Sequence, residues 1–316
     1  MKPDARVRND VDQALLVLVA HSGRAVARVS AMRNLMFRIV KGGARREELY
    51  DRLYSLGWGE TTTNNYGFAP ADGHAPERFQ MQLYTELLHL LDGWRAKSPI
   101  VHVLEVSCGR GGGLGHLARR LPRHAEVVGM DFSAHAIAFC KVHYAQVANM
   151  AFVRGHALDL PFKRASFDLV VNVEASHAYG DDPAFLREIS RVLHPEGRFL
   201  YADYRARKKL PRLEQQARRA GLAGDLHDIT KNVVRACELD AERRRRIIRS
   251  GLPWYARMLV GSSLEAYSGL PGTPNFERFR SGERTYFLTC MRPWEPRWDT
   301  PTGFRAGISS AHPQRP

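Results

Sequence analysis

Between residues 101 and 204 the chain alternates between short apolar runs and segments with helical spacing, and this alternation limits the fold more than any other feature. The apolar runs are VHVLEV (101–106), AEVVGMDF (125–132), MAFVRG (150–155), FDLVVNV (167–173) and RFLYADY (198–204). Helical segments such as GLGHLARRL (113–121) and PAFLREISRVL (183–193) separate them. The pattern is typical of βαβ units, in which helices cover a parallel sheet. We therefore predict an α/β fold.

A glycine-rich turn follows the first apolar run. In VLEVSCGRGGG (103–113) a strand ends at Val106 and a helix begins near Gly113. Glycine lets the backbone approach a ligand closely, and the start of a helix presents unpaired N–H groups. Asp131 lies 20 residues beyond Gly111, at the end of the next strand. Nucleotide-binding α/β folds place a ribose-binding carboxylate there, so the sequence predicts an adenosine-containing cofactor.

The same turn distinguishes between cofactors. The dinucleotide pattern GxGxxG would use Gly109 and Gly111 and would need a third glycine at position 114, where the chain has Leu114. An acid, Glu105, precedes the turn instead. A carboxylate at this place can reach the amino acid end of a cofactor that carries an ammonium and a sulfonium. The turn therefore favours such a cofactor over NAD.

With these residues the chain resembles the class I S-adenosylmethionine (SAM) methyltransferases. Five segments resemble the motifs of that family in their usual order: VLEVSCGRGGG (103–113), VVGMDFS (127–133), VRGHALDLPF (153–162), FDLVVNVEASHAY (167–179) and RVLHPEGRFLYADYR (191–205). Ser107 and His156 depart from the glycine and aspartate that the family usually has. The resemblance implies a Rossmann-like sheet of seven mostly parallel strands with helices on both faces. It also implies SAM as the cofactor.

The motifs carry the family's cofactor contacts onto particular positions of this sequence. The SAM-binding residues that the resemblance implies are Glu105, Ser107, Gly109, Gly111, Asp131, Phe132, His156, Ala157 and Asn172. VSCGRGGG, NVEASH and YAD also resemble the mycobacterial phthiotriol dimycocerosate methyltransferases and related natural-product enzymes. GRGG is similar to the prenyl diphosphate C-methyltransferases, and YSLGWGET (54–61) to an aromatic segment of sterol methyltransferases. These likenesses imply a lipophilic acceptor from lipid, terpenoid or other secondary metabolism.

The segment NVEASHAY (172–179) supplies the candidate catalytic residues, Glu174 and His177. They follow a predicted strand at its carboxyl end, where ligands of parallel α/β sheets bind. His177 is a candidate base, because an unperturbed imidazole titrates near pH ~6.5. Glu174 could orient His177, bind the acceptor or act as the base itself. The alternative is structural: Glu174 bonds nearby backbone, and His177 caps the following loop.

Basic and aromatic residues are the candidates for acceptor binding. YADYRARKKLPR (201–212) places Arg205, Arg207 and Lys208 after another strand end, as either an anion site or a solvated loop. We interpret ERRRR (242–246) as a solvated helix face. The aromatic residues expected to line an apolar acceptor pocket are Trp58, Tyr66, Tyr179, Trp254 and Tyr255.

Two versions of methyl transfer fit these residues. In the first, a hydroxyl oxygen is methylated and His177 is the base. In the second, an alkene carbon of a prenyl diphosphate (C5–C15) is methylated, the 205–209 rim holds the diphosphate, and Glu174 removes a proton. Only the second version involves Mg²⁺, and we expect no metal site built by the protein. NVEASH favours the first version, which we prefer. The rim and the net charge of +14 favour the second.

Other classes of function are less well supported. The positive charge permits a nucleic-acid methyltransferase, but the sequence has no RRM, KH or zinc-finger pattern and no (D/N)PPY-type motif. We therefore expect no nucleic-acid partner. A non-catalytic subunit with this fold is disfavoured by the intact Glu105, Gly109, Gly111 and Asp131.

Changes of pattern along the chain predict five parts. They are an N-terminal helical extension with an aromatic lid (1–76), the SAM-binding core (77–208), a helical cap (209–282), a final strand (283–293) and a loose tail (294–316). No apolar run approaches the ~20 residues that span a bilayer, so we expect no membrane partner. The four cysteines form no CxxC pair, which fits a cytoplasmic setting. The apolar faces of the first helices leave a homo-oligomer open.

Overall fold

The computed structural model describes residues 51, 54, 61–70, 78–94, 99–251 and 254–294, and only the backbone of 251 and 254–260. Most of the predicted N-terminal extension, the tail beyond 294 and Trp58 therefore lie outside the described residues. Among the described helices, none combines the length and the apolar content needed to cross a bilayer.

A central sheet organises the described chain. Its strands run in the order β3 (Met150–Arg154), β2 (Glu126–Asp131), β1 (His102–Val106), β4 (Phe167–Val173), β5 (Leu193–Ala206), β8 (Arg284–Pro293) and β6 (Leu222–Ala223), and β7 (His227–Asp228) also pairs with β8. The first five strands are parallel, and β8 is antiparallel to β5. The prediction of a mostly parallel sheet is confirmed. The number of strands is eight rather than seven, because β6 and β7 are two-residue strands that pair with separate parts of β8.

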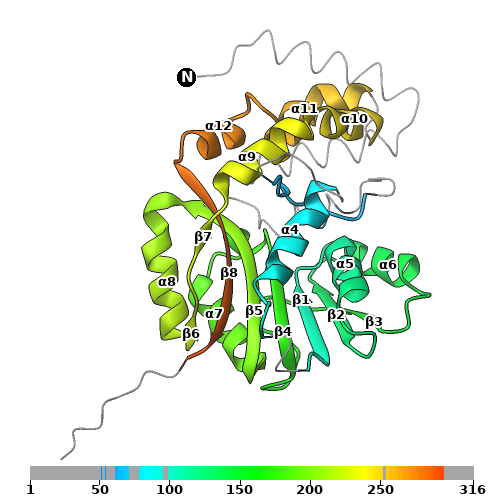
Figure 1. Cartoon of the computed structure of the whole chain (residues 1–316). Helices are drawn as coiled ribbons and strands as arrows, with labels where there is room; N and C mark the ends of the chain where they lie inside the picture. Colours follow the sequence, from blue (N-terminus) through cyan, green and yellow to red (C-terminus); the bar gives the residue numbers. More distant parts are fainter. Residues whose placement is uncertain are drawn as a thin grey trace, which may run out of the picture.

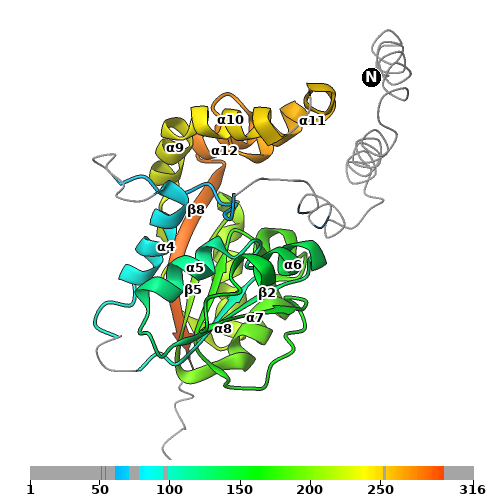
Figure 2. The ribbon, with the colours of Figure 1, turned by 90° about the vertical axis from the view of Figure 1, so that its right-hand side faces the viewer.

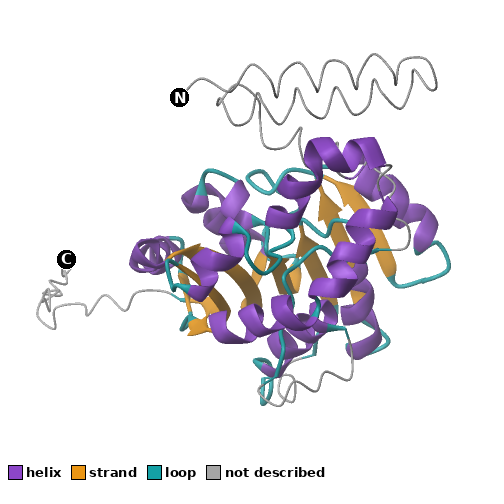
Figure 3. Cartoon of the chain, turned by 90° about the horizontal axis from the view of Figure 1, so that it is seen from above, coloured by secondary structure: helices purple, strands orange, loops and turns teal. Residues whose placement is uncertain are grey.

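Helices cover both faces of the sheet, as Figure 3 shows from above. On one face lie α4 (Phe79–His89), α5 (Gly112–Arg120) and α6 (Ala134–His143), and on the other α7 (Asp182–Val192) and α8 (Leu210–Arg219). Side chains alternate between the two faces along each strand, so Val103 joins the core under α5 and Leu104 the core under α7. Because both faces of the sheet are buried, most residues of these strands are apolar.

Local sequence signals fix where two helices begin. Ser133 caps α6, since its side chain accepts a hydrogen bond from the backbone N–H of Ala136. Asp181 caps α7 in the same way through Ala184, and Pro183 occupies the first turn. Both helices therefore begin directly after the carboxyl end of a strand or its loop, on the side of the sheet where a ligand would bind.

A group of four helices lies above the carboxyl ends of the parallel strands (Figures 1 and 2). This cap consists of α9 (Thr230–Leu239), α10 (Ala241–Gly251), α11 (Trp254–Tyr267) and α12 (Pro274–Arg280). The predicted insertion 209–282 is thus divided, because α8 packs on the sheet through Leu213 and Ala217. The cap and the strand ends together enclose the candidate site.

Candidate active site

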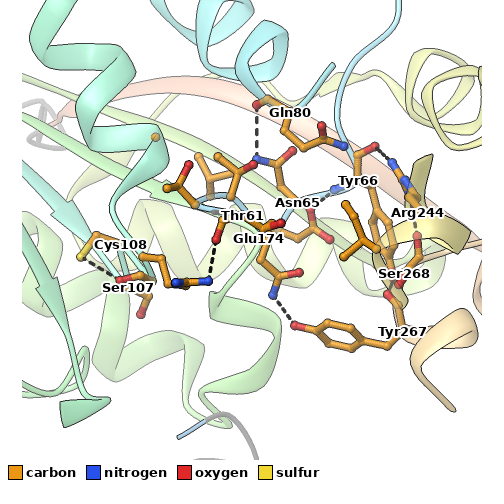
Figure 4. Close-up of a pocket in the computed structure, with 18 of the residues that line it drawn as sticks. Thr61, Asn65, Tyr66, Gln80, Ser107, Cys108, Glu174, Arg244, Tyr267 and Ser268 are labelled. Carbon is orange, nitrogen blue, oxygen red and sulfur yellow. Dashed lines mark hydrogen bonds between the residues drawn. The ribbon is translucent and has the colours of Figure 1, made fainter. Parts of the chain in front are cut away.

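Two adjoining cavities lie between the strand ends and the cap. The larger has a volume of about 160 Å³ and the smaller about 90 Å³. Ser107, Val173 and Glu174 line both of them. In the larger cavity Ser107 and Cys108 lie on one side, and Arg244 and Ser268 lie on the other (Figure 4). A molecule bound in one cavity would therefore face a molecule bound in the next.

The smaller cavity gathers the residues predicted to bind the adenosine part of a cofactor. Asp131, Phe132, His156 and Ala157 line it together. Both oxygens of Asp131 are oriented by backbone donors, since Oδ2 accepts from Gly109 N at 2.9 Å and Oδ1 from Ser133 N at 2.9 Å. Burial raises the pKa of Asp131 to about 6. The carboxylate is therefore held rigidly at the edge of a cavity that suits a nucleoside.

Two glycines of the turn after β1 are needed because neighbouring residues pack where a Cβ atom would lie, and not because the backbone must be flexible. A Cβ on Gly113 would lie 2.0 Å from Cζ of Tyr84, and one on Gly112 would lie 2.6 Å from the Thr62 hydroxyl. The backbone N–H of Gly112 donates to the Thr62 carbonyl at 3.1 Å. Gly111 has φ of 75° and packs towards α6, so it shapes the turn without lining either cavity. The segment 61–70 can lie on the turn only because side chains are absent there.

Glu105 lies beneath the turn and is almost completely buried. Its Oε1 accepts a hydrogen bond from the Tyr84 hydroxyl at 2.6 Å, and its Oε2 has no hydrogen-bond partner among the described residues. Burial raises the pKa of Glu105 to about 8. A buried carboxylate oxygen without a donor is costly, so a cationic ligand group would stabilise it. The ammonium of SAM has the charge and the donors that this oxygen lacks.

A chain of three polar side chains joins the turn to the loop after β4. Ser107 adopts φ of 60°, the left-handed conformation that suits the glycine usual at this position of the family. Its hydroxyl lies 2.6 Å from that of Tyr179, which also accepts from Asn172 Nδ2 at 2.9 Å. Asn172 is fully buried and lines neither cavity, and its Nδ2 donates both to Tyr179 and to the Val106 carbonyl. Tyr179, predicted for the acceptor, lines the smaller cavity instead.

His177 forms a pair with Asp203, a residue that the sequence analysis did not select. His177 lies in the short 3₁₀ helix η1 (Ser176–Ala178) and lines the larger cavity. Its Nδ1 is 2.8 Å from Oδ1 of Asp203, and its backbone N–H donates to Oδ2 at 3.0 Å. The ring stacks on Tyr204 with centroids 4.2 Å apart. Because Asp203 engages Nδ1, Nε2 is the ring nitrogen that has no hydrogen-bond partner among the described residues.

The negative charge of Asp203 is preserved inside the protein. Its side chain is fully buried, which raises the pKa, but the interactions with His177 and with the positive charge of Arg205 hold the pKa of Asp203 well below its usual range. The sequence contained Asp203 within YAD, near the end of β5, the strand that pairs with β4, and His177 follows β4. The register Val173 to Ala202 brings the two strand ends together. The two residues are 26 positions apart in the chain, so no local sequence pattern predicted their contact.

Glu174 connects three segments and does not orient His177. It has φ of 51°, and its Oε2 accepts from Tyr66 N at 2.7 Å and from the Tyr286 hydroxyl at 3.1 Å. Burial, and then the nearby charge of Asp203, raise the pKa of Glu174 to about 8. A carboxyl group that is largely protonated at neutral pH is a weak acceptor of protons. These contacts agree with the structural alternative, in which Glu174 bonds backbone.

The basic rim after β5 does not line either cavity. Arg205 is buried and bonds Asp182 at 2.8 Å and the Ser176 hydroxyl at 2.9 Å. Arg207 is exposed and forms an ion pair with Asp228 at 3.3 Å, and Lys208 is exposed beside it. Of the two alternatives for this stretch, the contacts favour a loop outside the cavities over an anion site, because Arg205 forms ion pairs with Asp182 and Asp203 and its neighbours line neither cavity.

The ERRRR segment supplies the positive charges that do line the larger cavity. Arg243 and Arg244 lie on its wall, whereas Arg245 and Arg246 are exposed. The interpretation of the whole run as a solvated face is thus wrong for two of its four arginines. A sequence signal existed, since Ile247 and Ile248 follow at helical spacing and line the same wall.

Only part of the predicted aromatic lining of the acceptor pocket lies among the described residues. Tyr66 is buried, lines the larger cavity and packs against Tyr204 with ring centroids 5.9 Å apart. The side chains of Trp254 and Tyr255 lie outside the described residues, although their backbone begins α11. The lining of the larger cavity by these two residues stays a prediction.

Comparison with known proteins places this geometry among methyltransferases. A family model described as a methyltransferase domain matches residues 97–244. A fatty-acid O-methyltransferase of Mycolicibacterium smegmatis is 32% identical over 257 residues, covering 80% of this chain and 88% of the relative. A phthiotriol/phenolphthiotriol dimycocerosates methyltransferase of Mycobacterium leprae is 35% identical over 185 residues, covering 58% of this chain and 66% of the relative. The match thus spans a little less than two thirds of that second relative.

A solved structure shares the fold. The crystal structure of the cyclase SpnF superimposes with a TM-score of 0.61 at 16% identity, covering 78% of this chain and 95% of that one. At this identity the likeness concerns the fold alone. Reaction and acceptor must be argued from the cavities themselves.

Proposed function

The chain belongs to the class I SAM-dependent methyltransferases, and on that premise we propose that it methylates a hydroxyl oxygen of a lipophilic small molecule. The observation that carries this proposal is the pairing of His177 with Asp203 on the wall of the larger cavity. A hydroxyl is a poor nucleophile until its proton is removed, and a histidine held by a buried carboxylate is suited to remove it.

The smaller cavity and the glycine turn are the part of the chain suited to hold the cofactor. SAM, when bound, supplies an electrophilic methyl group on a sulfonium. Asp131 is placed to accept hydrogen bonds from ribose hydroxyls, and His156 and Ala157 form the wall expected beside the adenine. Glu105 offers its unpartnered oxygen to the ammonium of the amino acid end. In this proposal these residues bind and orient the cofactor, and a different residue, His177, accepts the proton of the acceptor.

The chain's own chemistry concerns that proton. Nε2 of His177 would accept it from the acceptor hydroxyl, whose oxygen would take the methyl group that SAM supplies when bound, with the sulfur as the leaving group. The products are a methyl ether, S-adenosylhomocysteine (SAH) and a proton on His177, which then passes to solvent. Asp203 stabilises the imidazolium and fixes the ring so that Nε2 faces the acceptor. The cap and segment 61–70 limit the access of water.

Two kinds of observation support a lipophilic acceptor. Val173, Ile247 and Ile248 give the larger cavity an apolar strip, and Tyr66 and Tyr204 add aromatic surface. The two relatives described above are named as a fatty-acid O-methyltransferase and a phthiotriol/phenolphthiotriol dimycocerosates methyltransferase. The fatty-acid O-methyltransferase, which aligns with 80% of this chain, favours a second candidate reaction, the O-methylation of a carboxylate. That reaction needs no base.

The alternative of C-methylation on a prenyl diphosphate loses its main support. It relied on the rim at 205–209, and those side chains do not line the cavities. It also relied on Glu174 as a base, and Glu174 is engaged by Tyr66 and Tyr286. Mg²⁺, natural-product metabolism and a cytoplasmic location remain expectations from the sequence.

His177→Gln tests the proposal. With labelled SAM we would compare long-chain alcohols and phenols, fatty acids, and prenyl diphosphates with and without Mg²⁺. For a hydroxyl acceptor we expect kcat to fall by about 10²- to 10⁴-fold, because general-base catalysis contributes that much. The Kd for SAH should stay close to that of the wild type.

His124→Gln is the control, since His124 is exposed and lines neither cavity. Product from a fatty acid with unchanged kcat in His177→Gln would establish carboxyl methylation instead. Product only from a prenyl diphosphate would reject both forms of O-methylation.

A further inference from the structure

We propose that Arg243 binds a carboxylate, or another singly charged anionic group, of the acceptor at the end of the larger cavity formed by α10. This inference rests on the proposed function, because it names a chemical class for the molecule in that cavity. An apolar hydroxy acid would fit, with its anionic group at Arg243 and its hydroxyl towards His177. The lipophilic character of the acceptor alone does not predict such a group.

The guanidinium of Arg243 is held in a fixed orientation on the cavity wall. Its side chain is 29% exposed and forms an ion pair with Asp240. Its Nη2 also donates to Oε1 of Gln80 at 3.1 Å, and Gln80 Nε2 donates to Oδ2 of Asp240 at 2.9 Å. Gln80 belongs to α4, so two different elements support one guanidinium. Such support reduces the entropy lost when a ligand binds.

The wall carries more positive than negative charge. Arg244 also bonds Asp240, at 3.0 Å, so two guanidinium groups share one carboxylate. The remaining donors of Arg244 reach the carbonyls of Tyr66 and Ser268, and its side chain is only 7% exposed. Arg243 is therefore the member of the pair that a ligand can reach. An excess of one positive charge beside a cavity favours a singly charged anion.

The other charges around the cavity do not cancel this excess. Glu174 is the acidic side chain among the described lining residues, and burial raises its pKa to about 8. Asp203 is paired with His177 and Arg205. Arg110, on the glycine turn, adds a further positive charge to the lining. The described residues that line the cavity thus include three arginines and one acidic residue, Glu174.

The surface next to Arg243 is apolar. Ile247 and Ile248 lie one helical turn further along α10 and line the same cavity. This part of α10 thus presents a positive charge next to an aliphatic strip. Such a surface complements a ligand that has an anionic group attached to an aliphatic chain. Arg244, the neighbour of Arg243 in α10, lies with Ser268 across the cavity from Ser107 and Cys108 of the cofactor turn (Figure 4). The anion bound here is accordingly not the carboxylate of SAM.

Binding of two matched probes tests the site. With SAH-saturated protein, isothermal titration calorimetry would give Kd for 10-hydroxydecanoate and for 1,10-decanediol, which differ in the anionic group. We expect the wild type to prefer the acid by about tenfold, as a charge-assisted hydrogen bond allows. Arg243→Gln should bring the two Kd values close together, and Arg243→Lys should keep part of the preference.

Arg245→Gln is the matched control, because Arg245 is the exposed neighbour on the same helix and should leave the preference unchanged. Gln80→Glu is an independent variant that adds a negative charge beside Arg243, and it should also abolish the preference. Thermal unfolding would confirm that each variant folds. Equal binding of both probes by the wild type, an unchanged preference in Arg243→Gln, or a weaker Kd for SAH in that variant would each overturn the proposal.

Turnover is measured separately, so the two proposals fail in different ways. A preference for the acid without any methylated product would leave the anion site in place and reject the proposed function. Methylation of the diol as efficiently as of the hydroxy acid would reject the anion site and leave the function. His177→Gln should lose turnover and keep the acid preference, because His177 does not contact Arg243 or its partners.

Discussion

At the scale of single residues, backbone strain coincides with the candidate site. The described non-glycine residues with positive φ are Ser107, Ala165 and Glu174, and the first and last of them line both cavities. They follow β1 and β4, two neighbouring parallel strands. Such conformations cost about 1–3 kcal/mol each and persist where the surroundings hold them. Here Tyr179 holds Ser107, and Tyr66 and Tyr286 hold Glu174.

Glu174→Gln separates a structural carboxyl group from a catalytic base. The pKa of Glu174 is raised to about 8, so its proton is retained on folding and its contribution to stability is lost as pH rises towards 8. Glutamine imitates the protonated carboxyl. We therefore expect the urea midpoint of the variant to fall less between pH 5 and pH 8 than that of the wild type.

The same variant should keep kcat within about tenfold of the wild type, since His177 is the proposed base. Asp168→Asn is a suitable control for charge removal, because Asp168 accepts from the backbone of Val101 and His102 outside the cavities. A loss of kcat by hundreds of times in Glu174→Gln, with SAH affinity retained, would make Glu174 the base.

At the scale of elements, α4 and α5 position the buried acid of the turn. Tyr84 projects from α4 over Gly113, and its hydroxyl reaches Glu105. The two helices come close only because Gly113 lacks a side chain, and segment 61–70 lies on the turn only because Gly112 lacks one. The start of α5 is therefore set by packing with α4 and with segment 61–70, as well as by any ligand.

Gly113→Ala should damage both packing and cofactor binding. The new Cβ would overlap the Tyr84 ring, and overpacking of a core costs about 1–3 kcal/mol. Moving Tyr84 would also break the hydrogen bond that its hydroxyl donates to Glu105, so SAH binding should weaken. Gly115→Ala on the same helix is the control, since its Cβ would lie 3.1 Å from Tyr144. Equal unfolding free energies for the two variants would contradict this account of the turn.

The sequence was sufficient to predict those elements that are encoded by a local pattern of residues. Alternating apolar runs predicted the parallel strands, and the turn with Asp131 predicted the cofactor cavity that Phe132, His156 and Ala157 share. The pairing of His177 with Asp203 depends on the register of two strands, which no local pattern records. The burial of Arg205 depends on acids from two other elements. Side chains whose roles are decided by tertiary partners are those that sequence reasoning misplaced.

At the scale of the whole molecule, one arginine ties the cap to the core. Arg244 in α10 donates to the carbonyl of Tyr66 at 2.6 Å and also bonds the carbonyl of Ser268 and the carboxylate of Asp240. It thus joins the segment over the sheet to α10 and to the loop after α11. The enclosed cavity depends on these bonds.

Arg244→Ala should loosen the cap. Removing one partner from a buried ionic network costs about 3 kcal/mol or more, so the free energy of unfolding should fall by that order. Amide hydrogen exchange should quicken in 61–70 and in α10. Arg245→Ala, with its exposed side chain, should change stability by about 0.5 kcal/mol or less. Equal exchange rates in both variants would mean that other contacts hold the cap.

Tyr66 has a consequence for how this chain can change in evolution. Its N–H is bound by Glu174, its C=O by Arg244 and its hydroxyl by the carbonyl of Tyr267. Two of these three bonds use the main chain, which every amino acid except proline offers. Substitutions along segment 61–70 can therefore accumulate more freely than insertions or deletions, since a change of one residue in length would carry the peptide away from both of its partners.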